Sequence, residues 1–480
     1  MDKSITRKTT DGLIWNVTQK IASKGLQFLF SVWIARILIP EQYGIIAIAN
    51  LFISLSDILI DSGFSKALLR KQQKTKEDFS TVFWFNTAVS IVLYGLLFVC
   101  APYIGAYYKL EILPSVIRVL SLTLVVNALC GIQSLHLIAD MNFKKLAILE
   151  TAAMAAGGIA GLLLAMKGAG VWALVVQTLA GAVIRTILIW AFSKWEPDLS
   201  FSRESFKEFF NFGSKLLVSE FAIRLYGAVF TLAIGKNYAS KELGLYGKAD
   251  AFSSAPSSFL TGPLSAVTFP AIAQIQDEQE RLHKNYVQMN RFSAFVLFPI
   301  FVGLAAIADT LIPFLLTDKW KGMIPYLIIL SFSYLFSALA AIPQNYLLVF
   351  GKSDSILKIQ MITRLTGIVL LFPLLKISLV AVCCDIILVS FLTLSLTIYS
   401  LKRNAGYSIS EFVRTMFLPC VISLLMGFCV FSLTHLINIR IVALITGISV
   451  GSFLYGALSF ILQKEGIRSL YLLFKPYFKK

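Results

Sequence analysis

The sequence predicts an all-α polytopic membrane protein, with about fourteen transmembrane helices arranged as two pseudo-symmetric six-helix lobes around a central cavity plus two C-terminal helices. Of its 480 residues, 57% are hydrophobic and 14% are charged, whereas soluble globular proteins carry about 25% charged residues. Apolar stretches of around 20 residues, long enough to cross roughly 30 Å of hydrocarbon, recur along the whole chain. Lysines and arginines concentrate in alternate loops, as the positive-inside rule requires.

Each apolar stretch is expected to form one membrane-spanning helix, and short loops connect them. The predicted spans are residues 12–37, 44–65, 81–101, 115–137, 146–166, 171–192, 212–235, 249–274, 292–316, 323–349, 359–376, 379–400, 415–434 and 441–462. The short loops leave no room for a soluble catalytic or nucleic-acid-binding domain, so we expect no nucleic acid partner. The first span follows a polar start and lacks an Ala-x-Ala cleavage site, so it is expected to remain as a span.

The distribution of positive charge orients the chain. With the N-terminus in the cytoplasm, cytoplasmic segments carry about three times as many lysines and arginines as external ones. Residues 66–76 and the tail after residue 463 contribute most. The net charge of +17 is therefore mainly an orientation signal, and an even number of spans places both termini in the cytoplasm.

Cysteine and histidine give no sign of catalysis or metal binding. The six cysteines lie in apolar spans without a Cys-x-x-Cys pair, and the three histidines lie at span ends or in loops without triad or metal-ligand spacing. We therefore expect no enzyme activity, no bound metal and no cofactor.

An internal repeat organises the chain. Residues 20–54 align without a gap on residues 220–254, which places Lys24 on Arg224 and Gly44 on Gly244. Two halves related by an axis along the membrane normal are typical of transporters, with the substrate site between them. The predicted parts are an N-terminal lobe (1–192), a cytoplasmic linker (193–211), a C-terminal lobe (212–400) and two extra spans with a basic tail (401–480).

The linker contains a predicted helix start. Ser205 and Glu208 have the spacing of a capping box. Phe206, Phe209 and Phe210 then fall on one side of a short interfacial helix.

Polar residues follow one face of each of the first two spans. In the first span they are three or four residues apart: Asn16, Lys20, Lys24, Gln27 and Ser31. The second span continues the pattern with Asn50, Ser54, Asp57 and Asp61. Charges inside a bilayer are costly and usually face water or protein. One interpretation is a wet cavity that binds substrate, and the other is a buried ion-pair network in which Lys20 or Lys24 neutralises the two aspartates.

Further charged residues lie within other spans. Arg118, Arg185, Arg224 and Arg364 are candidates, with Lys20 and Lys24, for binding an anionic headgroup. Glu220 lies one helical turn before Arg224, a spacing typical of an ion pair. The candidates for ion coupling or charge pairing are Asp57, Asp61, Asp250 and Asp385.

Several segments resemble the polysaccharide transporter family, the Wzx-type lipid-linked oligosaccharide flippases of the multidrug/oligosaccharidyl-lipid/polysaccharide superfamily. The likeness covers roughly residues 10–400 and depends on the order and spacing of its motifs. They are IARILIPEQYGIIA (34–47), DSGFSKALLRK (61–71), FSTVFWFN (79–86), GAGVWALVVQ (168–177), FGSKLL (212–217), ELGLY (242–246) and FGKSD (350–354).

This resemblance implies a flippase of the bacterial inner membrane. Its substrate would be an undecaprenyl-diphosphate-linked oligosaccharide for O-antigen, capsule or exopolysaccharide synthesis, moved by alternating access of the two lobes. Basic residues such as Lys24 and Arg224 would bind the diphosphate, and a Na⁺ or H⁺ gradient would drive the cycle through acidic residues. A polysaccharide polymerase and other assembly proteins are expected partners, together with the bilayer.

Three other functions stay open. A multidrug-type cation antiporter of the same superfamily is expected to have an acidic cavity, which the basic stripe argues against. A membrane-embedded polymerase or glycosyltransferase needs a large external loop, and the longest predicted one, residues 236–248, is short. A non-transporting scaffold has no need of charge at the midplane.

Overall fold

The computed structural model describes residues 23–61, 63–71, 74–140, 142–193, 195–275 and 278–463. Every element formed by these residues is a helix. Eleven of the described helices are long and apolar enough to cross a membrane. The all-α membrane fold is thereby confirmed, while the number of fourteen spans stays a prediction.

The chain divides into two compact units, Met1–Gly244 and Leu245–Lys480. The boundary between the two units lies later in the chain than the predicted boundary between the lobes. The reason is that α9 (Arg203–Asn237) belongs to unit 1, where it packs against α2 (Pro40–Asp61), α3 (Phe64–Arg70) and α4 (Lys76–Tyr108).

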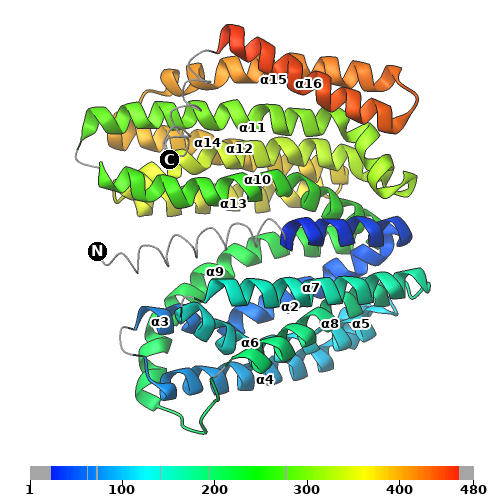
Figure 1. Cartoon of the computed structure of the whole chain (residues 1–480), viewed down its shortest axis with the longest axis vertical. Helices are drawn as coiled ribbons and strands as arrows, with labels where there is room; N and C mark the ends of the chain where they lie inside the picture. The colour runs from blue at the N-terminus through cyan, green and yellow to red at the C-terminus, as the bar shows by residue number, and fades with distance from the viewer. Residues whose placement is uncertain are drawn as a thin grey trace. The chain divides into compact units, whose positions relative to one another are not determined.

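Unit 1 is a helical bundle (Figure 1). It begins with a helix over residues 23–37 and ends in the first turn of α10 (Ser240–Gln274). The remaining helices of the unit are α5 (Leu113–Leu120), α6 (Leu122–Ala139), α7 (Phe143–Met166) and α8 (Val171–Phe192). Helices α7 and α8 pack closely because glycines face the neighbouring helix: a Cβ on Gly157 would lie 2.6 Å from the backbone oxygen of Gln177.

Unit 2 contains the rest of α10 and the later helices. They are α11 (Gln279–Leu316), the short 3₁₀ helix η1 (Asp318–Met323), α12 (Ile324–Val349), α13 (Ser353–Leu374), α14 (Leu379–Ala405), α15 (Ile409–Leu436) and α16 (Arg440–Leu462). Its largest core cluster joins α11, α12 and α14 through side chains such as Phe301, Tyr346 and Leu401.

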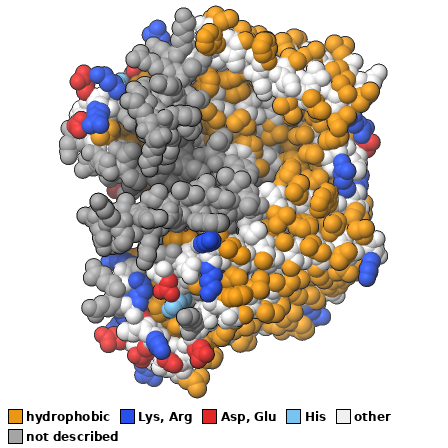
Figure 2. Space-filling model, in the orientation of Figure 1, with side chains coloured by type: hydrophobic (Ala, Val, Ile, Leu, Met, Phe, Trp, Pro, Cys, Tyr) orange, Lys and Arg blue, Asp and Glu red, His pale blue; other side chains and the backbone are white. Residues whose placement is uncertain are grey.

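The outer surface suits a bilayer. On the face drawn in Figure 2, hydrophobic side chains cover the middle of the helices and charged side chains collect at the helix ends. Large apolar side chains such as Phe428 and Phe453 are more than 70% exposed. A surface of this kind is stable only in contact with lipid or another apolar partner.

The linker is part of unit 1, and its predicted helix start is wrong. Helix α9 begins at Arg203, and Ser202 caps it by accepting a hydrogen bond from the backbone N–H of Ser205, at 3.2 Å. The helix then continues without a break to Asn237, so no separate interfacial helix forms. Phe209 is buried against Phe64 in a core cluster of unit 1.

The linker is also fixed to the start of α4. The backbone N–H groups of Asp198 and Ser202 donate to the hydroxyls of Ser80 and Thr81, at 3.0 and 2.9 Å. The indole of Trp84 donates to the backbone oxygen of Asp198 at 2.9 Å.

A buried carboxylate also takes part in the contact between the linker and α4. Asp78 is fully buried, and it accepts hydrogen bonds from Ser205 at 2.6 Å and from Lys71 at 2.8 Å. The hydrogen bond from Lys71 raises the pKa of this lysine above its ordinary value. Asp78 also forms a capping box with Thr75 that begins α4.

Candidate functional site

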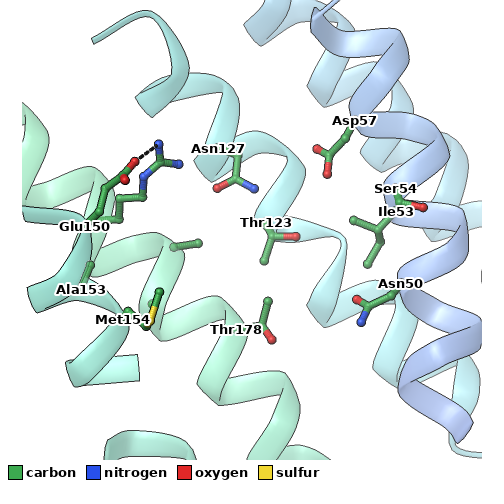
Figure 3. Close-up of a pocket in the computed structure, with 13 residues that line it drawn as sticks. Asn50, Ile53, Ser54, Asp57, Thr123, Asn127, Glu150, Ala153, Met154 and Thr178 are labelled. Carbon is green, nitrogen blue, oxygen red and sulfur yellow. Dashed lines mark hydrogen bonds and ion pairs between the residues drawn. The ribbon is translucent and has the colours of Figure 1, made fainter. Parts of the chain in front are cut away.

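Unit 1 has an open cavity of about 460 Å³ between α2, α6, α7 and α8. Its lining is rich in polar side chains although all four helices are apolar overall. The lining residues are Asn50, Ile53, Ser54, Asp57, Thr123, Asn127, Glu150, Ala153, Met154, Thr178, Gly181, Ala182 and Arg185. In the view of Figure 3, Asn50, Ser54 and Asp57 lie along α2, while Thr123 and Asn127 lie between that helix and Glu150.

The one arginine of the lining is already neutralised. Arg185 forms an ion pair with Glu150 at 3.1 Å and also donates to the hydroxyl of Ser134 at 3.3 Å. Of the two carboxylates in the lining, Asp57 is therefore the one that forms no ion pair with another lining residue. Arg224 of α9 attracts Asp57 electrostatically from the same unit.

The hydroxyl groups of the lining present oxygen lone pairs to the cavity. Ser54 and Thr178 each donate their hydroxyl proton to a carbonyl of their own helix, at 2.9 and 3.0 Å, and Thr123 donates to the carbonyl of Leu120 at the end of α5, at 2.6 Å. A hydroxyl whose proton is used in this way can only accept. Together with Asp57 and two amide oxygens, these groups form a wall that favours a cation or a proton over an anion.

A site with several carboxylates is not formed. Within the described ranges, no group of three or more His, Cys, Asp and Glu side chains gathers to hold a metal ion. One carboxylate surrounded by neutral oxygens is a set of ligands that suits a singly charged ion better than a transition metal.

The predicted pairings of the acidic residues are only partly testable. Asp61 accepts from the backbone N–H and the hydroxyl of Ser65, which lies one turn later. Lys20 lies outside the described residues, as does Asn16. The predicted pair of Glu220 with Arg224 is wrong, because Glu220 forms its ion pair with Lys66 of α3.

The remaining members of the first polar stripe lie on the helix over residues 23–37. Lys24 and Ser31 are half-buried there and Gln27 is exposed. Next to Lys24, the hydroxyl of Ser23 forms a hydrogen bond with that of Thr151 of α7, at 3.0 Å. This contact holds the stripe against unit 1.

Two other basic candidates do not line the cavity. Arg118 of α5 lies over the ring of Phe98, with its guanidinium carbon 4.5 Å from the ring centroid. Arg364 is half-buried on α13 of unit 2. Among the described candidates for anion binding, Arg185 is the one that lines the cavity.

Two predicted acidic residues lie in unit 2. Asp250 of α10 accepts a hydrogen bond from the hydroxyl of Tyr334, at 2.7 Å. Asp385 of α14 is 2% exposed, and neither of its carboxylate oxygens has a hydrogen-bond partner among the described residues. A buried carboxyl of this kind is costly as an anion, so Asp385 is expected to carry a proton or bind a cation.

Sequence reasoning missed the far wall of the cavity. Thr123 and Asn127 of α6 and Thr178 of α8 were not among the candidates, yet they face Asn50, Ser54 and Asp57. The available signal was the spacing of Thr123 and Asn127, which are one helical turn apart in an apolar span.

Relatives of known role are polysaccharide biosynthesis proteins. The chain is 26% identical over 334 residues to the succinoglycan biosynthesis transport protein ExoT of Rhizobium meliloti, covering 69% of this chain and 68% of that one. It is 27% identical over 331 residues to the lipopolysaccharide biosynthesis protein WzxC of Escherichia coli, with 68% and 66% covered. The teichuronic acid biosynthesis protein TuaB of Bacillus subtilis is 24% identical over 354 residues, with 73% of each chain covered.

Solved structures share the fold over nearly the whole chain. The lipid II flippase MurJ, in an inward closed conformation, matches with a TM-score of 0.78 at 16% identity, covering 95% of this chain and all of that one. A multidrug resistance transporter of the MATE family, facing inward, matches with a TM-score of 0.62 at 15% identity, covering 79% of this chain and 95% of that one. The family model described as polysaccharide biosynthesis protein matches residues 33–325, more than half of the chain. The chain therefore belongs to the polysaccharide biosynthesis protein family.

Proposed function

We propose that this membrane protein is a flippase that moves a lipid-linked oligosaccharide across the bilayer by alternating access, for the synthesis of a cell-surface polysaccharide. The single observation that carries the proposal is the combination of family and fold: a polysaccharide biosynthesis family match lies within a chain that shares the MurJ fold over 95% of its length. The three relatives contribute to three different polysaccharides. The activity is transport and not catalysis.

We place the protein in the bacterial inner membrane, with both termini in the cytoplasm. The support is the excess of positive charge in the predicted cytoplasmic loops. The glycan would be loaded in the cytoplasmic leaflet and delivered to the opposite leaflet, where a polysaccharide polymerase and other assembly proteins take it over.

Lys24 and Arg224 are proposed to bind the diphosphate of the substrate. Replacing Lys24 with alanine is expected to lower glycan export by about 10- to 100-fold, because a charge-assisted hydrogen bond contributes about 1.5–3 kcal/mol. Lys24→Arg keeps the charge and is the matched control. Export is measured as surface glycan at equal protein abundance in the membrane, and normal export by Lys24→Ala would exclude this role.

The oxygen-lined cavity of unit 1 is proposed to couple transport to a Na⁺ or H⁺ gradient. Asp57→Asn keeps the size of the side chain but removes its charge, so the variant is expected to lose the ion dependence of transport. Asp61→Asn, one helical turn away and outside the cavity lining, is the matched control. Flipping is measured in proteoliposomes with and without each gradient. A response to the gradient that persists in Asp57→Asn would contradict the assignment.

A direct assay separates the flippase from the drug antiporter. Deletion of the gene is expected to leave a lipid-linked oligosaccharide in the cytoplasmic leaflet, and the wild-type gene is expected to restore export. Proteoliposomes containing the purified protein are expected to translocate this lipid. Efflux of cationic dyes without translocation of the lipid would favour the antiporter instead.

A further inference from the structure

Unit 2 has a second, larger cavity at one end of its bundle. The cavity has a volume of about 1260 Å³ and lies where α11 and α15 begin and α16 ends. The predicted topology places this end at the cytoplasmic side. The volume exceeds the roughly 300–1,000 Å³ of pockets for drug-sized ligands, so the cavity has room for part of a lipid.

One part of the lining is positively charged. Arg291 of α11 and Arg414 of α15 both line it. Glu411 is the one carboxylate of the lining, and it already pairs with His283, at 3.0 Å. Arg414 is exposed and forms no hydrogen bond or ion pair with any described residue.

The start of α15 adds to this positive potential. Ser408 caps the helix, which is 28 residues long, and its hydroxyl accepts from the N–H of Glu411 at 3.5 Å. Helix N-termini attract anions because their N–H groups and the helix dipole point toward the ligand.

A buried amide in the same lining has an unpaired donor. Gln463, at the end of α16, is 6% exposed and lines the cavity. Its Nε2 is buried and donates no hydrogen bond within the part of the chain that the structure describes. A buried donor left unpaired costs about 1–3 kcal/mol, so a ligand that accepts a hydrogen bond is expected here.

Part of the lining is apolar and exposed. Phe417 of α15 and Ile461 of α16 line the cavity and are 65% and 66% exposed, and Leu462, the next residue, is 54% exposed. The lining thus combines two arginines with exposed apolar side chains, a combination that fits a phosphate attached to acyl chains.

We propose that this cavity binds an anionic glycerophospholipid, with its phosphate between Arg291 and Arg414 and its acyl chains along Phe417, Ile461 and Leu462. The site is distinct from the oxygen-lined cavity of unit 1 and does not depend on the proposed function.

Native mass spectrometry of the delipidated full-length protein tests the proposal. Phosphatidylglycerol and phosphatidylethanolamine with identical acyl chains are added separately, and the bound lipid is counted. We expect one phosphatidylglycerol to bind at least tenfold more tightly than phosphatidylethanolamine, whose ammonium the arginines repel. Arg291→Gln/Arg414→Gln is expected to remove this difference, since each charge-assisted contact contributes about tenfold.

Arg403→Gln is the matched control, because Arg403 is an exposed arginine at the end of α14 that does not line the cavity. Equal binding of both lipids by the wild-type protein would overturn the proposal without any variant. Unchanged phosphatidylglycerol binding by the double variant would overturn the assignment of the site. Displacement of the lipid by inorganic phosphate alone, or exclusive binding of undecaprenyl diphosphate, would overturn the choice of ligand.

Discussion

Gly44 and Gly244 form a reciprocal contact that leaves no space for a side chain. A Cβ on Gly44 would lie 1.8 Å from the carbonyl oxygen of Ser240, and a Cβ on Gly244 would lie 1.9 Å from that of Pro40. All four residues belong to unit 1. The starts of α2 and α10 thus touch backbone to backbone.

The cost of a methyl group at this contact follows from the distances. Real Cβ atoms essentially never approach another heavy atom closer than 3.0 Å, so Gly44→Ala requires the two helices to separate by more than 1 Å. Overpacking of this kind costs about 1–3 kcal/mol, occasionally more. An alanine in an open helix position instead contributes about 0.5–1 kcal/mol of stability relative to glycine. Both Gly→Ala variants gain this helix propensity, so we expect Gly44→Ala to be about 1–3 kcal/mol less stable than a matched variant at an open position.

Gly95→Ala on α4 is that variant, because nothing lies within 4 Å of the added Cβ. Thermal unfolding of the purified proteins in one detergent compares the two, and the expected difference in midpoint is about 1–3 °C, since the unfolding entropy of a chain of 480 residues is about 1 kcal/mol/K. The double variant Gly44→Ala/Gly244→Ala is expected to lose less than the sum of the single changes, because the first separation of the helices also relieves the second clash. Equal midpoints for Gly44→Ala and Gly95→Ala would refute the contact.

Two further changes test unit 1. Arg185→Gln is expected to destabilise the protein by about 1–2 kcal/mol, because it removes the positive charge that pairs with Glu150 in a half-buried wall; Arg185→Gln/Glu150→Gln should recover most of this loss in thermal unfolding, and no recovery would argue against the pair. Ser205→Ala is expected to cost about 1.5–3 kcal/mol, since it removes a hydrogen bond to the buried Asp78; faster proteolysis between α8 and α9 is the measurement, and unchanged cleavage would contradict the contact.

The sequence predicted the helices well because a span must satisfy all its backbone hydrogen bonds internally. The apolar stretches therefore reveal where helices lie, even where their ends are imprecise. The start of α9 shows the limit: Ser205 and Ser202 are both plausible caps. The helix begins after Ser202, where the backbone of the preceding residues is hydrogen-bonded to Ser80 and Thr81 of α4. These bonds join residues far apart in the sequence, so no local rule predicts them.

Pairings between distant charges were harder to predict. Glu220 was assigned to Arg224 because they are close in sequence, whereas Lys66 reaches it from another helix. Similarly, the spacing of Asn50, Ser54 and Asp57 places them on one face of α2, but the cavity exists only because α6, α7 and α8 complete its wall. Periodicity identifies the face of one helix and cannot identify which helix lies opposite.

Residues 198–202, between α8 and α9, form hydrogen bonds to α4 through their backbone groups. The N–H groups of Asp198 and Ser202 and the carbonyl of Asp198 make these bonds, while Ser80, Thr81 and Trp84 supply the side chains. For these bonds the constraint on amino-acid identity therefore lies on α4, whereas Trp195 and Ser202 are constrained by their own side chains, which pack against Phe79 and cap α9. Among related proteins, residues 198–201 should be free to diverge in sequence as long as their length and backbone path are kept, and substitutions of Ser80, Thr81 and Trp84 should weaken the attachment.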